Sequence, residues 1–265
     1  MAEVHATAIV DSKARLGENV KIGPYCVVGP DVDLGEAVVL HSHVVVEGRT
    51  KIGPRCEIYP FASIGHRPQD LKYRGEPSEL IIGADNMVRE HVTMNPGTEG
   101  GGMVTRVGNG CLFMMGSHVA HDCQIGEGVI LANNATLGGH VIVEDHAIIG
   151  GLSAVHQFVR IGRHAMVGGM SGVEHDVIPY GLAIGERARL QGLNVVGLKR
   201  RGLARAEIQA LGEAYDLIFA QDDTLASRVE RAARKFATAQ AVGDVVAFIQ
   251  AESSRALCRP KEGNA

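Results

Sequence analysis

Hydrophobic side chains recur along this chain at every sixth position. Over the first 64 residues an aliphatic residue fills each such position, beginning with Val4. After an interruption the period returns at Ile82, and after a shift of one residue it runs on to Val173. The positions are Val4, Val10, Leu16, Ile22, Val28, Leu34, Leu40, Val46, Ile52, Ile58, Ile64, Ile82, Val88, Met94, Val107, Phe113, Val119, Ile125, Leu131, Leu137, Val143, Ile149, Val155, Ile161, Val167 and Val173. Neither a helix nor an alternating strand repeats every six residues, so the pattern indicates another element.

Three short strands joined by tight corners account for the six-residue period. Such a coil uses three hexads, or 18 residues, and stacks on the next at roughly 4.8 Å with its backbone groups paired. Glycine follows half of the repeating positions, as at Gly23, Gly53 and Gly126, which suits a corner where the backbone turns without a side chain. The sequence therefore predicts a parallel β-helix over residues 1–185.

The interior of this helix is predicted to be narrow. The chain has 34 Gly, no Trp and only 4% aromatic residues, yet 45% of it is apolar, so small aliphatic side chains must fill the core. The fifth position of each hexad also points inward and is mostly small. Four of the five cysteines stand there, and no C-x-x-C pair occurs. We interpret them as small buried spacers and not as a disulfide framework or a zinc site.

Two stretches break the period and are predicted to project as loops. They cover residues 66–80 and 96–106, and the second contains Gly100-Gly101-Gly102. Loops on a rigid scaffold often carry binding groups, although they can also simply tolerate insertion. From about residue 186 a helical period replaces the hexads, which predicts a C-terminal α-helical domain over 186–265 that covers the open end of the β-helix.

Charge excludes one broad class of function. The chain has 26 basic and 30 acidic residues, so no global positive field exists to hold a nucleic acid. Basic residues concentrate at 199–201 and 228–235, where they form either solvated faces or a binding surface. No stretch of 18 apolar residues occurs, and residues 1–5 do not begin a leader peptide, so we expect a cytoplasmic protein without a transmembrane segment.

Histidines supply the main chemical clue. Six of the 12 lie between residues 118 and 164, and the 18-residue coil places His140 directly beyond Asp122. The segment from His118 to Asp122 can therefore present two imidazoles and a carboxylate near His140. The histidines are either tolerated corner residues, ligands of a zinc ion as in the β-helical carbonic anhydrases, or an acid–base group. The grouping with Asp122 favours catalysis over a metal site.

Five segments resemble the UDP-N-acetylglucosamine acyltransferase family, which catalyses the first step of lipid A synthesis. They are Gln69-Asp70-Leu71-Lys72-Tyr73, Ala120-His121-Asp122-Cys123, Leu131-Ala132-Asn133-Asn134-Ala135-Thr136-Leu137, Ala154-Val155-His156-Gln157-Phe158 and Gly197-Leu198-Lys199-Arg200-Arg201-Gly202. The resemblance implies a left-handed parallel β-helix of hexapeptide repeats, where the general crossover rule would predict a right-handed one. It also implies a homotrimer with active sites between subunits, and transfer of an (R)-3-hydroxyacyl group from acyl carrier protein to the sugar 3-position of a UDP-amino sugar. It implies no metal and no organic cofactor.

The resemblance also implies roles for single residues. His121 would be the general base for the sugar 3-hydroxyl, Asp122 would orient its imidazole, and the Gly139 N–H would stabilise the oxyanion. Gly169 would mark the end of the acyl groove, where a glycine leaves room for a long chain. The other implied substrate contacts are Gln69, Asp70 and Lys72 for the sugar and phosphates, His118, His140, His156 and Gln157 for the cleft, and Asn194 and Arg200 for the nucleotide.

Two departures from the family pattern bear on specificity. Asn95-Pro96-Gly97-Thr98 stands where many members have His-Arg-Gly-Thr, so positive charge is missing beside the expected sugar site. This change could ease binding of an amine, and the alternative function is acylation of the 3-amino group of a 2,3-diamino sugar nucleotide. Val196 stands where an acidic residue is common near the nucleotide.

Other classes remain as alternatives to this function. The later sugar N-acyltransferase of the same pathway usually has an additional N-terminal domain, whereas the hexads here begin at Val4. A zinc hydratase and a structural solenoid are the other two. Because acyl carrier protein is acidic, Arg200 and Arg201 or the basic run 228–235 are candidate docking groups.

Overall fold

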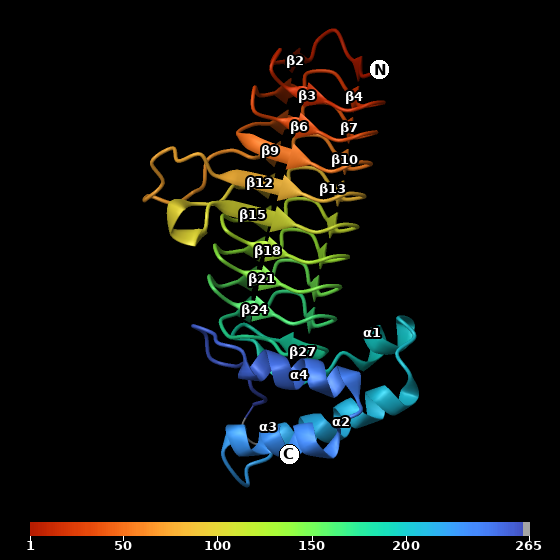
Figure 1. Ribbon diagram of the computed structural model, residues 1–265, viewed down its shortest axis with the longest axis vertical. Helices are drawn as coiled ribbons and strands as arrows, with labels where there is room; N and C mark the ends of the chain where they lie inside the picture. The colour runs from red at the N-terminus through yellow and green to blue at the C-terminus, as the bar shows by residue number, and fades with distance from the viewer. Residues whose placement is uncertain (262–265) are drawn as a thin grey trace.

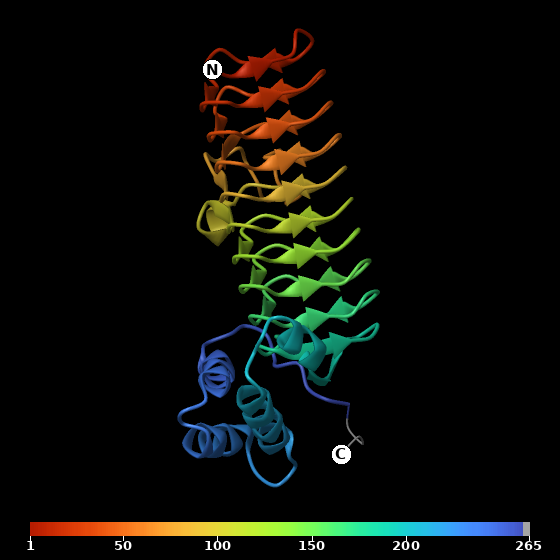
Figure 2. The same ribbon diagram turned by 90° about the vertical axis from the view of Figure 1, so that its right-hand side faces the viewer.

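The computed structural model describes residues 1–261 and shows a column of stacked coils with helices at its C-terminal end (Figures 1 and 2). Up to Val173 each strand pairs in parallel with the third strand along the chain, so every coil contributes one strand to each of three sheets. The fold is the predicted left-handed parallel β-helix with a helical C-terminal part.

The strands are short because each spans only one side of a coil. The first sheet contains β1 (Glu3–Val4), β4 (Lys21–Ile22), β7 (Val39–Leu40), β10 (Glu57–Ile58), β13 (Met87–Val88), β16 (Leu112–Phe113), β19 (Ile130–Leu131), β22 (Ile148–Ile149), β25 (Met166–Val167), β27 (Gly181–Ile184) and β28 (Arg189–Leu193). The second contains β2 (Ile9–Val10), β5 (Val27–Val28), β8 (Val45–Val46), β11 (Ser63–Ile64), β14 (Thr93–Met94), β17 (His118–Val119), β20 (Thr136–Leu137), β23 (Ala154–Val155) and β26 (Gly172–Val173). The third contains β3 (Arg15–Leu16), β6 (Asp33–Leu34), β9 (Arg49–Ile52), β12 (Glu79–Ile82), β15 (Val104–Val107), β18 (Gln124–Ile125), β21 (Ile142–Val143) and β24 (Arg160–Ile161). At the C-terminal end of the first sheet β25 pairs with β27, and β27 pairs with β28 in antiparallel fashion.

The hexad positions fill the core, with an exception at the N-terminal end. Val4 is 43% exposed because no further coil packs above the first one within the described chain. The five cysteines are buried and unpaired, as expected of spacers. The thiols of the four hexad cysteines donate to backbone carbonyls of the next coil, as from Cys123 to Gly138 at 3.2 Å. Burial raises the pKa of Cys111 to about 11 and that of Cys123 to about 12, so both stay protonated.

Both predicted loops leave the column on the same side (Figure 1). They cover residues 65–78 between β11 and β12 and residues 95–103 between β14 and β15, so each is shorter than predicted at its C-terminal end. The second loop contains a single 3-10 turn, Glu99–Gly101. A backbone bond joins the second loop to the start of β12, which follows the first loop, since the Gly97 N–H donates to Glu79 O at 3.2 Å.

The helical part covers the last coil. It consists of α1 (Val195–Arg200), α2 (Arg205–Phe219), α3 (Leu225–Lys235) and α4 (Gln240–Gln250), and α4 lies directly beneath β27 in Figure 1. Strands continue to Leu193, beyond residue 185 where we placed the domain boundary. The C-terminal segment returns to the column, where the Asp176 N–H donates to Ala256 O at 2.9 Å. Within residues 1–261, none of the helices has the length and hydropathy that a membrane span needs.

Candidate active site

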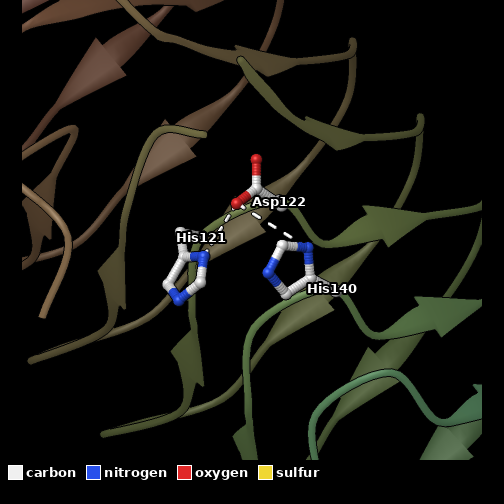
Figure 3. Close-up of side chains that lie close together, drawn as sticks. All are labelled: His121, Asp122 and His140. Carbon is white, nitrogen blue, oxygen red and sulfur yellow. Dashed lines mark hydrogen bonds and ion pairs between the residues drawn. The ribbon is translucent and has the colours of Figure 1, made fainter. Parts of the chain in front are cut away.

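The candidate site lies at the corner where the chain passes from the second sheet to the third. Asp122 follows β17 at this corner, and His140 occupies the same corner one coil further, both with φ of 62°. The His140 N–H donates to His121 O at 3.0 Å, which fixes the two coils in register. The structure therefore brings His121, Asp122 and His140 together, as the 18-residue spacing predicted (Figure 3).

His121 and Asp122 form a buried hydrogen-bonded pair. The His121 Nδ1 lies 2.7 Å from Asp122 Oδ2, and the two side chains are 9% and 0% exposed. A carboxylate can only accept here, so Nδ1 carries the proton and Nε2 is left as a free base. This is the arrangement that a general base with an orienting carboxylate requires.

The loop 95–103 supplies further donors to this carboxylate. The Thr98 N–H donates to Asp122 Oδ1 at 2.8 Å, and Thr98 Oγ1 donates to Oδ2 at 2.6 Å. Burial acts to raise the pKa of Asp122, but the hydrogen bonds from His121 and Thr98 lower it below its ordinary value. The carboxylate therefore stays charged. No role was predicted for Thr98, because it lies outside the hexad pattern.

His140 and His118 flank the pair as neutral imidazoles. The His140 Nδ1 lies 3.8 Å from Asp122 Oδ2, and its ring stacks on Phe158 with 4.3 Å between centroids. Burial lowers the pKa of His140, with Asp122 opposing the shift. Burial also lowers the pKa of His118, whose Nδ1 lies 2.7 Å from Thr93 Oγ1. The charges of the first loop reach this corner too, because Asp70 and Lys72 influence the pKa of His140.

Gly139 provides an unengaged amide beside the base. Its N–H makes no hydrogen bond among residues 1–261, whereas the N–H groups of its neighbours Gly138 and His140 are both paired. The His121 ring packs on Gly139 so closely that an added Cβ would lie 2.6 Å from Nε2. A side chain at position 139 would therefore displace the imidazole. This geometry fits the oxyanion donor that we expected.

His156 and Gln157, which we expected to line the cleft, lie one coil beyond Gly138 and Gly139, and both are exposed. Arg255 from the C-terminal segment contacts both, with Nη2 2.7 Å from His156 Nδ1 and Nε donating to Gln157 O at 2.9 Å. Arg255 was not predicted, because nothing in the local sequence indicates that the chain returns here after α4.

The remaining predicted contacts lie at other corners. Asn194 caps α1: its Oδ1 accepts the Gly197 N–H at 3.1 Å, and its Nδ2 donates to His164 O at 3.1 Å. His164 is at the corner between the third and first sheets. Gly169 is exposed at the corner between the first and second sheets, where a Cβ would lie 3.3 Å from Gly151 O. Within one chain, the predicted site residues therefore lie at three different corners of the column.

The first-loop residues Gln69 and Lys72 are exposed, and Asp70 is half-buried with its Oδ1 accepting the Lys72 N–H at 2.9 Å. Asn95, which we expected beside the sugar, is only 6% exposed and donates through Nδ2 to His66 O at 3.0 Å. It therefore anchors the first loop. Its Oδ1 has no hydrogen-bond partner within the described part of the chain.

The two basic runs differ in the structure. Arg200 and Arg201 are exposed and form no ion pair with any of residues 1–261. In the second run, Arg228 is buried at 9% exposure, contrary to the solvated face or docking surface that we considered. Arg231 and Lys235 there pair with acidic residues, at 2.8 Å for the Arg231–Asp222 pair. The second run therefore offers little free positive charge.

A metal site at this corner would disturb the hydrogen bonds just described. One donor atom each from His121, Asp122 and His140 lie within 4.8 Å of one another, as metal ligands would. Both Asp122 oxygens, however, already accept hydrogen bonds from His121 or Thr98. The arrangement suits an orienting carboxylate better than a zinc ligand. A cavity of about 540 Å³ on the outer face of the third sheet is lined by other residues.

Comparison with known proteins gives matches over nearly the whole chain. Residues 176–258 match the family described as Udp N-acetylglucosamine O-acyltransferase, domain 2, and residues 13–48 and 105–139 match the bacterial transferase hexapeptide family. The acyl-[acyl-carrier-protein]–UDP-N-acetylglucosamine O-acyltransferase of Azorhizobium caulinodans is 51% identical, covering 99% of this chain and 97% of the relative. The protein of the same name from Rickettsia canadensis is 49% identical, covering 97% of each.

Solved structures agree with these relatives. The UDP-N-acetylglucosamine O-acyltransferase of Moraxella catarrhalis superposes with a TM-score of 0.89 at 42% identity, covering 97% of this chain and 99% of that one. The UDP-N-acetylglucosamine acyltransferase of Campylobacter jejuni gives 0.92 at 35% identity, covering 98% and 100%. The similarity therefore includes the helical part as well as the coils.

Proposed function

Because the chain belongs to the UDP-N-acetylglucosamine O-acyltransferase family, we propose that it transfers an acyl group from acyl carrier protein to UDP-N-acetylglucosamine, the first step of lipid A biosynthesis. The observation that carries the chemistry is the 2.7 Å pair of His121 and Asp122 beside the unengaged Gly139 amide. We take the acyl group to be (R)-3-hydroxyacyl and the acceptor to be the sugar 3-hydroxyl. The reaction would take place in the cytoplasm, where acyl carrier protein is loaded.

The proposed transfer takes place in two steps. The His121 Nε2 takes the proton of the sugar hydroxyl while its oxygen bonds to the thioester carbonyl carbon, and the Gly139 N–H stabilises the negative carbonyl oxygen. The intermediate then collapses, the C–S bond breaks, and the carrier thiolate takes the proton from the His121 imidazolium. Asp122 stabilises that imidazolium without itself taking a proton.

The first loop and the last corner would select the substrates. Lys72 carries a point charge that suits a diphosphate, and Gln69 and Asp70 offer polar groups to the sugar. Gly169 leaves its corner open, which supports a long acyl chain over a short one. The relatives are named O-acyltransferases, so we favour the hydroxyl over the 3-amino acceptor that the absence of charge at Asn95-Pro96 suggested.

We also propose that the chain works as a homotrimer. The predicted contacts fall on three corners of one column, so a neighbouring copy would have to bring Asn194 and Arg200 to His121. An apolar ribbon supports this assembly, because consecutive coils of the first sheet turn aliphatic side chains outward in register. Its members are Met87, Leu112, Ile130, Ile148 and Met166. Light scattering tests the trimer, and an active monomer would refute it.

One assay tests the reaction. Purified protein is incubated with 3-hydroxyacyl carrier protein and either UDP-N-acetylglucosamine or its 3-amino analogue, and acyl transfer is measured for the wild type, His121→Ala and the control His43→Ala. We expect His121→Ala to lower kcat by about 100- to 10,000-fold, because it removes the base. The control, at an exposed corner of the N-terminal coils, should leave kcat unchanged. Absence of transfer to either sugar would contradict the proposal, and zinc content with chelator inhibition would then support the hydratase.

A further inference from the structure

The Asp122 carboxylate is held by a residue that lies 24 positions earlier in the chain. Thr98 is only 4% exposed, and it donates one hydrogen bond to each carboxylate oxygen. Together with the His121 Nδ1–H, these donors leave Asp122 with a fixed rotation about its side chain. No hexad position supplies such a contact. It exists because the loop 95–103 folds back over the corner.

We propose that Thr98 is a positioning residue that determines which imidazole forms a hydrogen bond with the Asp122 carboxylate. This inference rests on the proposed function, because it assigns a task to the same base. Two rings compete for one oxygen: Asp122 Oδ2 lies 2.7 Å from His121 Nδ1 and 3.8 Å from His140 Nδ1 (Figure 3). A modest rotation of the carboxylate would exchange these partners.

The hydroxyl of Thr98 blocks this rotation. It donates to Oδ2 at 2.6 Å, the same oxygen that His121 uses, while the Thr98 N–H holds Oδ1 at 2.8 Å. The two donors come from one residue with a fixed backbone, so the plane of the carboxylate is fixed as well. His121 thereby keeps its proton on Nδ1 and presents Nε2 as the base.

Gly101 completes the enclosure. A Cβ built at this position would lie 2.0 Å from Asp122 Cγ, so any side chain there would push the carboxylate away. Only glycine lets the loop close over the carboxylate, whose side chain is fully buried. Water that could satisfy a rotated carboxylate is thereby excluded, and rotation would leave Asp122 with an unpaired charged oxygen.

The loop 95–103, which carries Thr98 and Gly101, is also bonded to the first loop. Glu76 in the first loop accepts the Glu99 N–H at 3.2 Å, and Asn95 in the second donates to His66 O at 3.0 Å. The loop that carries Gln69 and Lys72 therefore supports the loop that carries Thr98. The two insertions act as one unit at the corner.

The test compares three variants with the wild type. Thr98→Val keeps the shape and the backbone N–H but removes the hydroxyl, and Thr98→Ser restores the hydroxyl. Thr50→Val is the matched control, because it removes another fully buried threonine hydroxyl, which donates to Glu47 O at 2.6 Å. We expect Thr98→Val to lower kcat by about 10- to 100-fold with the KM of both substrates within about twofold, the size typical of residues that orient a functional group. Thr98→Ser should recover most of the loss.

The imidazole tautomer distinguishes positioning from stability. Nitrogen-15 NMR of the histidine rings should show a single Nδ1–H tautomer of His121 in the wild type and a mixture in Thr98→Val. If the wild type is active and Thr98→Val has the same kcat and the same His121 tautomer as the wild type, this inference is overturned. A wild type without transfer would refute the proposed function, while the NMR result would still test whether Thr98 positions the Asp122 carboxylate.

Should Thr98→Val fold poorly, Gly101→Ala provides the second test. It leaves both Thr98 donors in place but displaces the carboxylate, so kcat and the His121 tautomer should change in the same direction. A Gly101→Ala enzyme with wild-type kcat would contradict the proposal.

Discussion

At the scale of single residues, His164 combines burial with a cationic neighbourhood. Its ring stacks between His146 and Tyr180 at centroid distances of 5.0 and 5.6 Å, and its Nδ1 has no partner in the described part of the chain. Burial, together with the charges of His146, Arg201 and Arg163, lowers its pKa to about 4. The folded protein therefore keeps this ring neutral at pH values where the unfolded chain would protonate it.

This difference predicts a pH-dependent stability. Between about pH 6.5 and 4 the unfolded chain binds the His164 proton and the folded chain does not, so the free energy of unfolding should fall as the pH falls through this window. His164→Phe, which preserves the stack, should reduce the fall, and His66→Phe in the exposed first loop should not. Denaturant titrations at pH 7, 5.5 and 4.5 measure this. Equal slopes in the wild type and His164→Phe would refute it.

Part of the site could be predicted from residue spacing alone. His121 and Asp122 are neighbours in sequence, and the 18-residue coil correctly placed His140 beside them. Thr98 and Arg255 reach the same region through loops and a returning tail, whose paths no period encodes. The same limit applies to Asn95, whose side chain anchors the first loop instead of lying open beside the expected sugar site.

At the scale of the coil, the hexad rule predicts the inward positions but assumes that they are apolar or small. Asn86 occupies such a position and is 1% exposed. Its Nδ2 donates to Gly83 O and Gly108 O, both at 2.9 Å, and its Oδ1 accepts the Cys111 N–H at 2.7 Å. These bonds connect two neighbouring coils just where the second insertion shifts the hexads by one residue.

We expect Asn86→Ala to lower the free energy of unfolding by about 2–4 kcal/mol, because it leaves the buried Cys111 N–H and two carbonyls without partners. The control is Asn109→Ala. Asn109 is an exposed amide that also bonds between coils, and its loss should cost less than about 1 kcal/mol. Urea unfolding of both variants makes the comparison, and similar midpoints would show that Asn86 does not hold the coils together.

At the scale of the whole molecule, we expect the unpaired basic residues near the helical end to form the docking surface for the acyl carrier. Acyl carrier protein is acidic, and Arg200 and Arg201 are exposed beside the last coils without ion pairs in residues 1–261. Arg231 and Arg234 already pair with Asp222 and Glu230. Free charge, and not the number of arginines, should therefore determine where the carrier binds.

Charge reversal tests which of these two surfaces binds the acyl carrier. Replacing Arg200 and Arg201 by Glu should raise the KM for the acyl carrier about tenfold or more at low salt, with a smaller effect at high salt because surface charges are screened. The double change at Arg231 and Arg234 is the control and should alter that KM little. Steady-state kinetics at two salt concentrations measure both. A larger effect at 231 and 234 would move the docking surface to α3.

The register between coils has a consequence for the evolution of this architecture. Every coil presents the same two edges to its neighbours, so a gene duplication or deletion of 18 codons within residues 17–46 would change the height of the column and leave every contact of the His121 corner in place. A deletion of a single codon there would instead turn inward side chains outward. Within these regular coils, lineages are therefore free to lengthen or shorten the column only in whole turns.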